Sequence, residues 1–446
     1  MRLNEIRSAL EDLELRPSKK LGQNFLHDQN LARAIALAAV PEPAAFAVEI
    51  GPGLGALTAP LLERCAQLLV IEKDARLAEW LRGHLPADRV RIEHADAVDF
   101  DWRPLMRHGP FPLAGNLPYY ATSPILRNFL GPASPVSRAV FAVQDEFAAR
   151  LAAGPDSPDY SALSVRLQRV WSVRRERPLP PGVFHPEPGV QSAVVVLQRR
   201  SPRAFLPVRA AFFDELVQRG FSQRRKQLRA LLGVDRAAWT TWCEARSLPP
   251  TLRAENLSVE AWVDLARVLD PAAAVTAQND SEQFDVVDET DRVIGQAGRG
   301  VVHAQNRRHR AVHILVFNHQ GELLLQKRSA WKDREPLKWD SGAAGHLEPG
   351  EDYLSAAGRE TAEELGFHPT LQRVGKIAAS PGTGQEFVEV FTTRHDGPFL
   401  LPPAEIEDAV FFAVPVVEEW LAVRPEDFSP GFREVWKLYA AGRTAP

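Results

Sequence analysis

The chain has 446 residues, too many for one ordinary hydrophobic core, so two or three domains are expected. It is 45% hydrophobic and 25% charged, with a net charge of −4, as is typical of a soluble globular protein. A charged N-terminus and the lack of a membrane-length apolar run argue against secretion and membrane insertion, and two cysteines cannot form a disulfide framework, so a cytoplasmic protein is expected.

The first chemical signal is a glycine loop that follows an apolar strand. Residues 47–50 are predicted to form the strand, and residues 51–55 (GPGLG) lead from it into a helix near Leu57. Such a loop lets the backbone approach a cofactor closely. NAD or FAD would be the usual ligand, but only one residue separates Gly53 from the third glycine, which is not the spacing of the dinucleotide fingerprint.

Three further polar residues follow apolar strands in the same way. Residues 68–71 lead to Glu72, about where a ribose-binding acid is expected after a first βα unit. Residues 90–92 lead to Asp96, which is placed to contact an adenine ring, and residues 111–115 lead to Asn116. Because the carboxyl ends of parallel strands lie at one edge of a sheet, we expect one ligand site in a doubly wound α/β fold.

The tetrapeptide Asn116, Leu117, Pro118, Tyr119 places an amide, a kinked backbone and an aromatic ring together. Methylation of an adenine amino group requires the base to leave its stack, lie against an aromatic face and direct its amine at acceptors. The side-chain oxygen of Asn116 and the carbonyl of Leu117 are the candidate acceptors. Asn and Pro are also ordinary turn residues, so a turn that only ends the strand is the alternative for this segment alone.

Residues 17–270 resemble the rRNA adenine N6-dimethyltransferases of the KsgA/Dim type, which are similar to the macrolide-resistance methylases and mitochondrial transcription factor B. The resemblance rests on residues 19–26 (KKLGQNFL), the loop 49–55, Glu72, Asp96-Ala97, residues 116–119 (NLPY) and residues 184–192 (FHPEPGVQS). Family members commonly carry glycine in place of Ala95 and asparagine in place of Tyr120, and neither departure removes a catalytic group.

The resemblance implies S-adenosylmethionine as the methyl donor. It places around the donor Asn24, Leu26, Gly51, Gly53, Glu72, Asp96 and Asn116. It also implies that Asn116, Leu117, Pro118 and Tyr119 form the catalytic segment, and that Tyr119 and Phe184 hold the target adenine between them.

Charge is distributed unevenly along the chain. Residues 1–270 carry more basic than acidic side chains and the remainder carries fewer, and residues 199–229 hold nine basic residues against two acidic ones. Such a surface attracts phosphate, so we expect RNA to be bound by Arg224, Arg225, Lys226 and Arg229. A solvated helix face is the alternative. Residues 221–229 also resemble the helical subdomain of the rRNA enzymes, which favours small-subunit (16S) rRNA, within a pre-30S particle, as the substrate.

A change of composition after Asp270 predicts a domain boundary. Residues 271–281 are small and polar and lack apolar periodicity. We therefore expect a methyltransferase domain at 1–200, a helical RNA-binding subdomain at 201–270, a linker at 271–282 and a further domain at 283–446. In that last domain, residues 311–317 and 323–326 are predicted strands around a turn, and residues 353–365 are a predicted helix.

This helix carries a second signature, which resembles the Nudix box and implies an α/β/α Nudix fold. Gly345, Glu351, Arg359-Glu360, Glu363-Glu364 and Gly366-Phe367 fit its spacing, with Thr361 at a position that is normally apolar. Glu360, Glu363 and Glu364 share one helical face, so their carboxylates are a candidate site for Mg²⁺. An acidic solvated helix without a ligand is the alternative.

Residues 283–446 also resemble the Nudix branch that is close to isopentenyl-diphosphate isomerase. Such isomerases need a catalytic cysteine, and no cysteine follows Cys243, so hydrolysis of a nucleoside or other organic diphosphate is expected instead. The candidate phosphate contacts are Arg308, His309, Arg310, Lys327 and Arg328. His313, in its apolar strand, is expected to be a packed histidine.

Together these features predict a monomeric enzyme that dimethylates two adjacent adenosines in the 3′-terminal hairpin of small-subunit rRNA during subunit biogenesis. Its Nudix domain is expected to hydrolyse a diphosphate. The alternative is an RNA-binding assembly factor with a vestigial methylase site and a diphosphate-sensing Nudix module. Intact Glu72, Asp96 and residues 116–119 argue against it.

Overall fold

The computed structural model describes residues 2–18, 22–270 and 282–442. These form two compact units, Met1–Ala204 with Asp214–Trp262, and Phe205–Phe213 with Val263–Pro446. The basic residues 19 and 20 and all but the last residue of the predicted linker 271–282 lie outside the described residues. Within the described ranges, no helix is both long and apolar enough to cross a bilayer.

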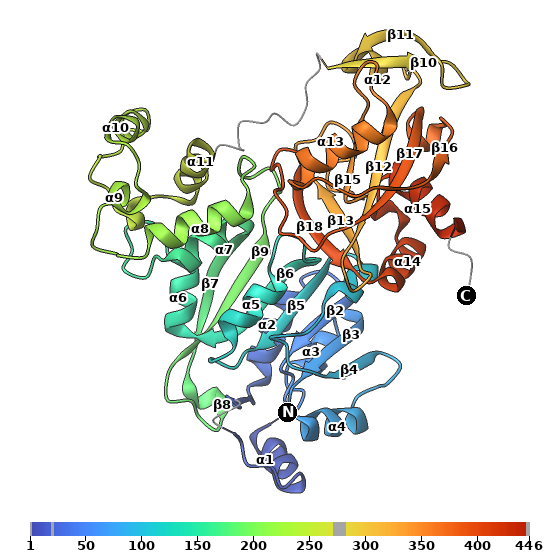
Figure 1. The fold of residues 1–446 in the computed structure, drawn as a ribbon. Helices are drawn as coiled ribbons and strands as arrows, with labels where there is room; N and C mark the ends of the chain where they lie inside the picture. Colours follow the sequence, from blue (N-terminus) through green and yellow to red (C-terminus); the bar gives the residue numbers. More distant parts are fainter. Residues whose placement is uncertain (1, 19–21, 271–281, 443–446) are drawn as a thin grey trace. The chain divides into compact units, whose positions relative to one another are not determined.

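The first unit is built on a seven-stranded sheet (Figure 1). Its spatial order is β4 (Val90–His94), β3 (Cys65–Glu72), β2 (Ala44–Ile50), β5 (Phe111–Asn116), β6 (Val136–Gln144), β9 (Ser192–Arg199) and β7 (Trp171–Leu179). The strands from β4 to β6 pair in parallel, and β9 is antiparallel to both of its neighbours. Strand order reverses between β2 and β5, and ligands of open α/β sheets bind at such a reversal.

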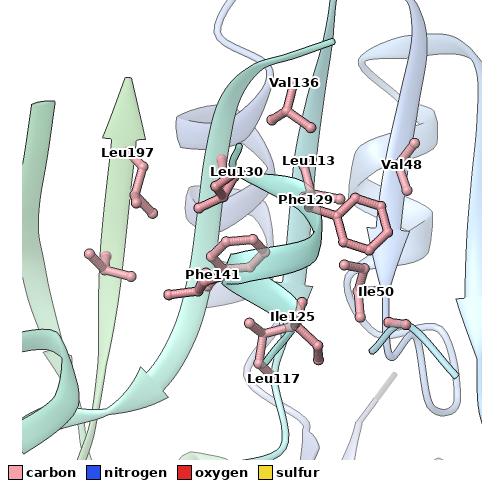
Figure 2. Close-up of a cluster of buried hydrophobic side chains, with 14 of the residues drawn as sticks. Val48, Ile50, Leu113, Leu117, Ile125, Phe129, Leu130, Val136, Phe141 and Leu197 are labelled. Atoms are coloured by element: carbon pink, nitrogen blue, oxygen red, sulfur yellow. The ribbon is translucent and has the colours of Figure 1, made fainter. Parts of the chain in front are cut away.

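Alternating side chains of the central strands feed two separate hydrophobic cores. In β3, Leu69 and Ile71 belong to one core, while Leu68 and Val70 belong to the other. The first core includes α5 (Thr122–Phe129), α6 (Asp145–Ala152) and α7 (Ala162–Val170); Figure 2 shows its centre around Phe129 and Phe141. The second core includes α2 (Gln29–Ala39) and α3 (Thr58–Leu62). Helices on both faces explain why these strands are apolar throughout, as a doubly wound fold requires.

Shorter elements complete this unit. Helix α1 (Leu3–Asp12) precedes β1 (Phe25–Leu26), which pairs with β8 (Phe184–His185), and α4 (Ala75–His84) follows β3. Pairing of β1 with β8 joins two of the motifs that are far apart in the sequence, since Leu26 lies opposite Phe184.

Four helices follow the sheet: α8 (Ala210–Gly220), α9 (Leu228–Leu232), α10 (Arg236–Glu244) and α11 (Val259–Leu269). Gly220 lies against the indole of Trp262, where an added Cβ would sit 2.4 Å from the ring. The Tyr160 hydroxyl donates a 3.0 Å hydrogen bond to the Leu257 carbonyl, which fastens this region to the sheet unit. Because the division between the two units passes through α8 and α11, the boundary at residue 200 stays a prediction.

The second unit contains another mixed seven-stranded sheet. Its main path is β14 (Trp339–Asp340), β13 (Leu323–Arg328), β12 (His309–Phe317), β17 (Glu386–Arg394) and β16 (Gln372–Ile377); β15 (Ala343–His346) pairs with β12, and β18 (Ile406–Phe412) with β13. A hairpin of β10 (Gln283–Val287) and β11 (Val293–Gly298) precedes it. The helices are α12 (Arg299–Ala304), α13 (Tyr353–Leu365), α14 (Val414–Val423) and α15 (Pro430–Gly442).

Helix α13 begins and ends where its sequence predicts. The Asp352 carboxylate accepts hydrogen bonds from the backbone N–H groups of Leu354 and Ser355, and Gly366 ends the helix at φ +80°. Thr361, at the normally apolar position of the box, is fully buried, and its hydroxyl donates to the Ala357 carbonyl at 2.7 Å. This bond to the preceding turn satisfies the hydroxyl, so threonine is tolerated there.

Candidate active sites

A cavity lies at the carboxyl edge of the first sheet, where strand order reverses. It encloses about 950 Å³ of empty space, counting the part open to solvent. All seven residues predicted around the methyl donor line it: Asn24, Leu26, Gly51, Gly53, Glu72, Asp96 and Asn116. The structure therefore brings together side chains from the ends of β1 to β5.

The glycine loop and Glu72 are held by backbone hydrogen bonds. The Gly53 N–H donates to Glu72 Oε2 at 3.1 Å, and the Asp74 N–H donates to Glu72 Oε1 at 2.8 Å. Burial raises the pKa of Glu72, and these two bonds oppose the rise. Gly53 has φ +58°, and an added Cβ would lie 2.9 Å from the Phe25 ring, so only glycine fits. Glu72 thus shapes the loop as well as facing the cavity.

Glu49 is a lining residue that was not among the predicted donor contacts. Its side chain is 1% exposed and accepts a 2.7 Å hydrogen bond from the Thr58 hydroxyl. Burial raises the pKa of Glu49 to about 8, against the effect of the Thr58 bond. An acidic residue inside an otherwise apolar strand was the available signal in the sequence.

Asp96 has a cationic partner in the lining of the cavity. Its Oδ2 lies 2.5 Å from Lys73 Nζ, and its Oδ1 accepts a hydrogen bond from the Val98 N–H at 3.0 Å. Lys73 also lies 5.8 Å from the ring centre of Tyr120, the residue that departs from the family pattern. Lys73 and Tyr120 both line the cavity. Tyr120, which departs from the family pattern, therefore lies near Asp96, the predicted adenine contact.

Asn116 is held in one orientation. Its Nδ2 donates a 2.7 Å hydrogen bond to the carbonyl of Asn24, whose own Nδ2 donates to the Gly22 carbonyl at 3.3 Å. Because the amide nitrogen is engaged, the Asn116 Oδ1 is the end that can accept from a ligand amine.

The other residues of the predicted catalytic set are buried or half-buried, and most are held by hydrogen bonds. Leu117 is 1% exposed and its N–H donates to the Ala142 carbonyl, while the Pro118 carbonyl accepts from the Thr122 hydroxyl. The half-buried Tyr119 shares a 2.7 Å hydrogen bond with the Ser192 hydroxyl. Phe184 is buried in the core that includes α2, so an adenine held between Tyr119 and Phe184 stays a prediction.

The basic segment is less uniform than its composition indicates. Arg199 donates hydrogen bonds to four backbone carbonyls, and Arg209 forms an ion pair with Asp270, so both have structural roles. Residues 222–226 form turns and bends rather than a helix face.

The four predicted RNA contacts lie in and just after these turns. Arg224, Arg225 and Lys226 are exposed, and Arg229 is half-buried. Arg224 pairs with Glu255 at 2.7 Å, and Arg229 donates to the Val234 carbonyl at 3.3 Å. Arg225 and Lys226 are therefore the stronger candidates for contacting phosphate.

In the second unit, Arg359 connects the helix α13 to the loop before it. Its guanidinium donates to both carboxylate oxygens of Glu351 and to the His346 carbonyl. It also pairs with Glu360 at 2.8 Å and with Glu363 at 3.1 Å. Two of the three predicted metal ligands are thus bound to one arginine.

Glu360 and Glu364 are buried carboxylates crowded together. Burial raises the pKa of Glu360 to about 7, although Arg359 opposes the rise. Burial, and then the charges of Glu405 and Glu360, raise the pKa of Glu364 well above its ordinary value. The Glu360 carboxyl group also occupies the space at Gly345 where a Cβ would lie, only 2.0 Å from it. Such a set of oxygen ligands fits a hard divalent cation, and Glu405 is a neighbour that the sequence did not reveal.

The second unit also has a cleft with about 1250 Å³ of empty space, counting its open mouth. Among its lining residues are three arginines, Arg299, Arg328 and Arg334. Of the predicted phosphate contacts, Arg328 lines this cleft and pairs with Asp340, whereas Arg310 is paired with Asp291. His313 is buried and hydrogen-bonded to the Ser341 hydroxyl at 2.8 Å, as expected of a packed histidine.

Comparisons with known proteins match both parts of the chain. A model of the ribosomal RNA adenine dimethylase family matches residues 15–270, and a model of the NUDIX domain matches residues 307–432. The ribosomal RNA small subunit methyltransferase A of Anaeromyxobacter sp. (strain K) is 42% identical over 277 residues, which cover 59% of this chain and 97% of that protein. The protein of the same name from Bordetella avium (strain 197N) is 40% identical over 262 residues, which cover 58% and 97%.

Two solved structures are also similar. A dimethyladenosine transferase from Plasmodium falciparum is 20% identical with a TM-score of 0.46, covering 54% of this chain and 95% of that one. A NUDIX hydrolase from Nitrosomonas europaea is 22% identical with a TM-score of 0.25, covering 31% and 93%. From the family models and the relatives, we conclude that the chain belongs to the ribosomal RNA adenine dimethylase family and carries a Nudix hydrolase domain after its methyltransferase.

Proposed function

We propose that the first part of the chain transfers methyl groups from S-adenosylmethionine to two adjacent adenosines in the 3′-terminal hairpin of small-subunit rRNA. The observation that supports this most strongly is the convergence of Asn24, Glu72, Asp96 and Asn116 on one cavity. The substrate would be a pre-30S particle in the cytoplasm, and the reaction a step in small-subunit biogenesis.

The residues of the cavity have separate tasks in this proposal. Bound S-adenosylmethionine supplies an electrophilic methyl group. The Glu72 carboxylate accepts hydrogen bonds from ribose hydroxyls, and Asp96 accepts one from the adenine of the donor. The Asn116 Oδ1 and the Leu117 carbonyl accept the N–H groups of the target amine and direct its lone pair at the methyl group. Alignment of this kind is worth several orders of magnitude in rate without an acid or base.

Labelled S-adenosylmethionine and undermethylated small subunits test the proposal directly. The full chain should label the rRNA, and mapping should place the label on two adjacent adenosines of the 3′-terminal hairpin. Label at any other position would refute the proposed target. Tight RNA binding without any methyl transfer would favour the alternative of an assembly factor with a vestigial site.

For the second part, we propose Mg²⁺-dependent hydrolysis of a nucleoside or other organic diphosphate. The supporting observation is the crowded carboxylate set of Glu360 and Glu364, with Glu363 on the same helix and with Glu360 and Glu363 both paired with Arg359. Bound Mg²⁺ would neutralise the diphosphate and help form the attacking hydroxide. The three glutamates would hold the cation, and Arg359 fixes the positions of Glu360 and Glu363.

A panel of substrates tests this second activity. Nucleoside diphosphates, dinucleotides and prenyl diphosphates are incubated with the full chain and Mg²⁺ or Mn²⁺, and released phosphate is measured. Cleavage of one class identifies the substrate. Saturable binding without cleavage would instead support a diphosphate-sensing module.

A further inference from the structure

Tyr120 is an exposed aromatic residue beside the predicted catalytic segment. It directly follows Tyr119, its side chain is 53% exposed, and it lines the donor cavity. Tyr119, by contrast, is half-buried, and its hydroxyl is hydrogen-bonded to that of Ser192. The ring of Tyr120 is therefore accessible to a molecule that approaches the cavity from solvent.

The backbone that carries Tyr120 is held in a turn between β5 and α5. The Ala121 N–H donates to the Pro118 carbonyl at 3.0 Å, and the Thr122 hydroxyl donates to the same carbonyl at 3.1 Å. Pro118 also lies against Gly22, where an added Cβ would be 2.9 Å from the proline ring. The place of Tyr120 at the cavity is thus fixed before any ligand binds, as a precise contact requires.

A cation lies beside the ring of Tyr120. Lys73 Nζ is 5.8 Å from the ring centre and 2.5 Å from Asp96 Oδ2. A cation at this distance is attracted to the face of an aromatic ring. Because Asp96 holds Lys73, this neighbour of the ring is fixed, while more than half of the Tyr120 side chain stays open to solvent.

A second exposed apolar side chain belongs to the loop that contacts this turn. Val190 is 47% exposed and precedes Ser192 by two residues. The 2.7 Å bond between Tyr119 and Ser192 joins the loop to the turn of Tyr120. Single exposed apolar side chains are common on protein surfaces, whereas two on joined segments at a cavity favour a contact surface.

The proposed reaction produces a base that needs such a surface. An adenine can reach the donor only when its nucleotide leaves the base stack, and the adjoining base then loses a stacking partner. Aromatic side chains replace that partner in complexes with single-stranded RNA. Loss of one such stacked contact typically weakens binding by roughly fivefold to 150-fold.

We propose that the ring of Tyr120 stacks on the base next to the target adenosine. This inference rests on the proposed methylation of two adjacent adenosines, one of which would lie against Asn116 while the other lies on Tyr120. The asparagine that is common at this position in the family has no ring, so the contact would distinguish this chain from such relatives. Tyr120 would select RNA in which the target has an unpaired neighbour, and it would take no part in the transfer itself.

Binding of RNA hairpins to the full chain tests the contact. The intact hairpin carries two adjacent adenosines in its loop, and two further hairpins carry an abasic nucleotide in place of one or the other. Tyr120→Ala and Tyr120→Asn should bind the intact hairpin roughly fivefold to 150-fold more weakly than the parent. Tyr120→Phe, which keeps the ring, should bind like the parent. Leu37→Ala, which changes an exposed apolar residue of α2, is the control and should also bind like the parent.

The abasic hairpins complete a double-mutant cycle. One of them should bind the parent more weakly than the intact hairpin does, by the same factor as Tyr120→Ala loses. That hairpin and the intact one should bind Tyr120→Ala equally, because the missing ring and the missing base remove a single interaction. Additive losses with both abasic hairpins would overturn the proposal, and so would an unchanged RNA affinity in folded Tyr120→Ala.

Two further measurements separate this contact from other roles. Calorimetry should give the same dissociation constant for S-adenosylmethionine in Tyr120→Ala and in the parent. Weaker donor binding with unchanged RNA binding would assign the ring to the donor and overturn the proposal. Methyl transfer to undermethylated small subunits is measured separately. A coupled cycle without transfer by the parent would keep the contact and remove only the proposed methylation, whereas transfer with an additive cycle would remove only the contact.

Discussion

Asn116 and Asn24, which are 92 positions apart in the sequence, are joined by a 2.7 Å hydrogen bond from the Asn116 amide to the Asn24 carbonyl. One lies at the end of the central strand β5 and the other just before β1. The bond therefore fixes the direction of the Asn116 Oδ1 relative to the cavity before any substrate is bound.

We expect Asn116→Ala to lower kcat for methylation by roughly 100-fold, because loss of alignment at the reacting amine has an effect of that size. Binding of S-adenosylmethionine should be only partly weakened. Steady-state assays with undermethylated subunits and calorimetry measure the two effects. Asn30→Ala, an exposed asparagine in α2, is the control, and near-normal methylation by Asn116→Ala would contradict the assignment.

Replacement of Glu72 tests the ribose contact. Glu72→Ala should weaken the binding of S-adenosylmethionine by roughly 1.5–3 kcal/mol, the usual value for hydrogen bonds to a charged acceptor. Since Glu72 also accepts from Gly53 and Asp74, Glu72→Gln is needed as a variant of the same size. Titration calorimetry decides the matter, and an unchanged dissociation constant in both variants would show that Glu72 does not contact the donor.

The exposed pair Arg225 and Lys226 should carry more of the RNA affinity than Arg224, which is paired with Glu255. Replacing both with alanine should reduce the slope of log affinity against log salt by about 1.4–1.8, because each phosphate contact contributes roughly 0.7–0.9. The charge-matched control replaces Arg76 and Arg82, both in α4. If the variant kept the slope of the parent protein, these two side chains would not contact RNA phosphate.

In the Nudix domain, Glu363→Gln keeps the size of the side chain and the helix propensity but removes a charge that we propose binds the metal. Once a substrate is found, Mg²⁺-dependent hydrolysis should fall by roughly two orders of magnitude, since the metal supplies several kcal/mol to the transition state. Circular dichroism should show an unchanged fold. A full rate would mean that the acidic face of α13 is not catalytic.

The buried carboxyl group of Glu49 should make the stability of the fold depend on pH. Its pKa of about 8 in the folded chain lies above the ordinary 4.5, so the carboxyl favours folding most below pH 4.5 and this contribution is lost as pH rises toward 8. Glu49→Gln removes the titration and keeps an acceptor for Thr58. Its melting temperature should exceed that of the parent at pH 8, with a difference that shrinks toward pH 5. Glu42→Gln, at an exposed position, should show no such trend.

Much of the fold is encoded locally and was predictable. Apolar strands that end in a polar or glycine residue predicted the parallel sheet and the edge at which its ligand site lies. All seven predicted donor contacts line one cavity. Helix α13 matches its predicted range of 353–365 because Asp352 and Gly366 are strong end signals. The fold class of both parts is confirmed by the family comparisons.

Features that depend on long-range packing could not be predicted. A count of basic residues does not reveal that Arg199 is occupied by four carbonyls or that Arg209 is paired with Asp270. Nor does the spacing of His309, His346 and Glu386 in the sequence show that they lie together, because only the pairing of β12 with β15 and β17 brings them close.

Gly345 has a consequence for how this protein can change over time. Its missing side chain is the space that Glu360 fills, so even a single methyl group there would push the carboxylate out of place. If Glu360 binds the metal as we propose, one nucleotide change in the codon of Gly345 would remove the second activity while all three glutamates of α13 stay in the sequence.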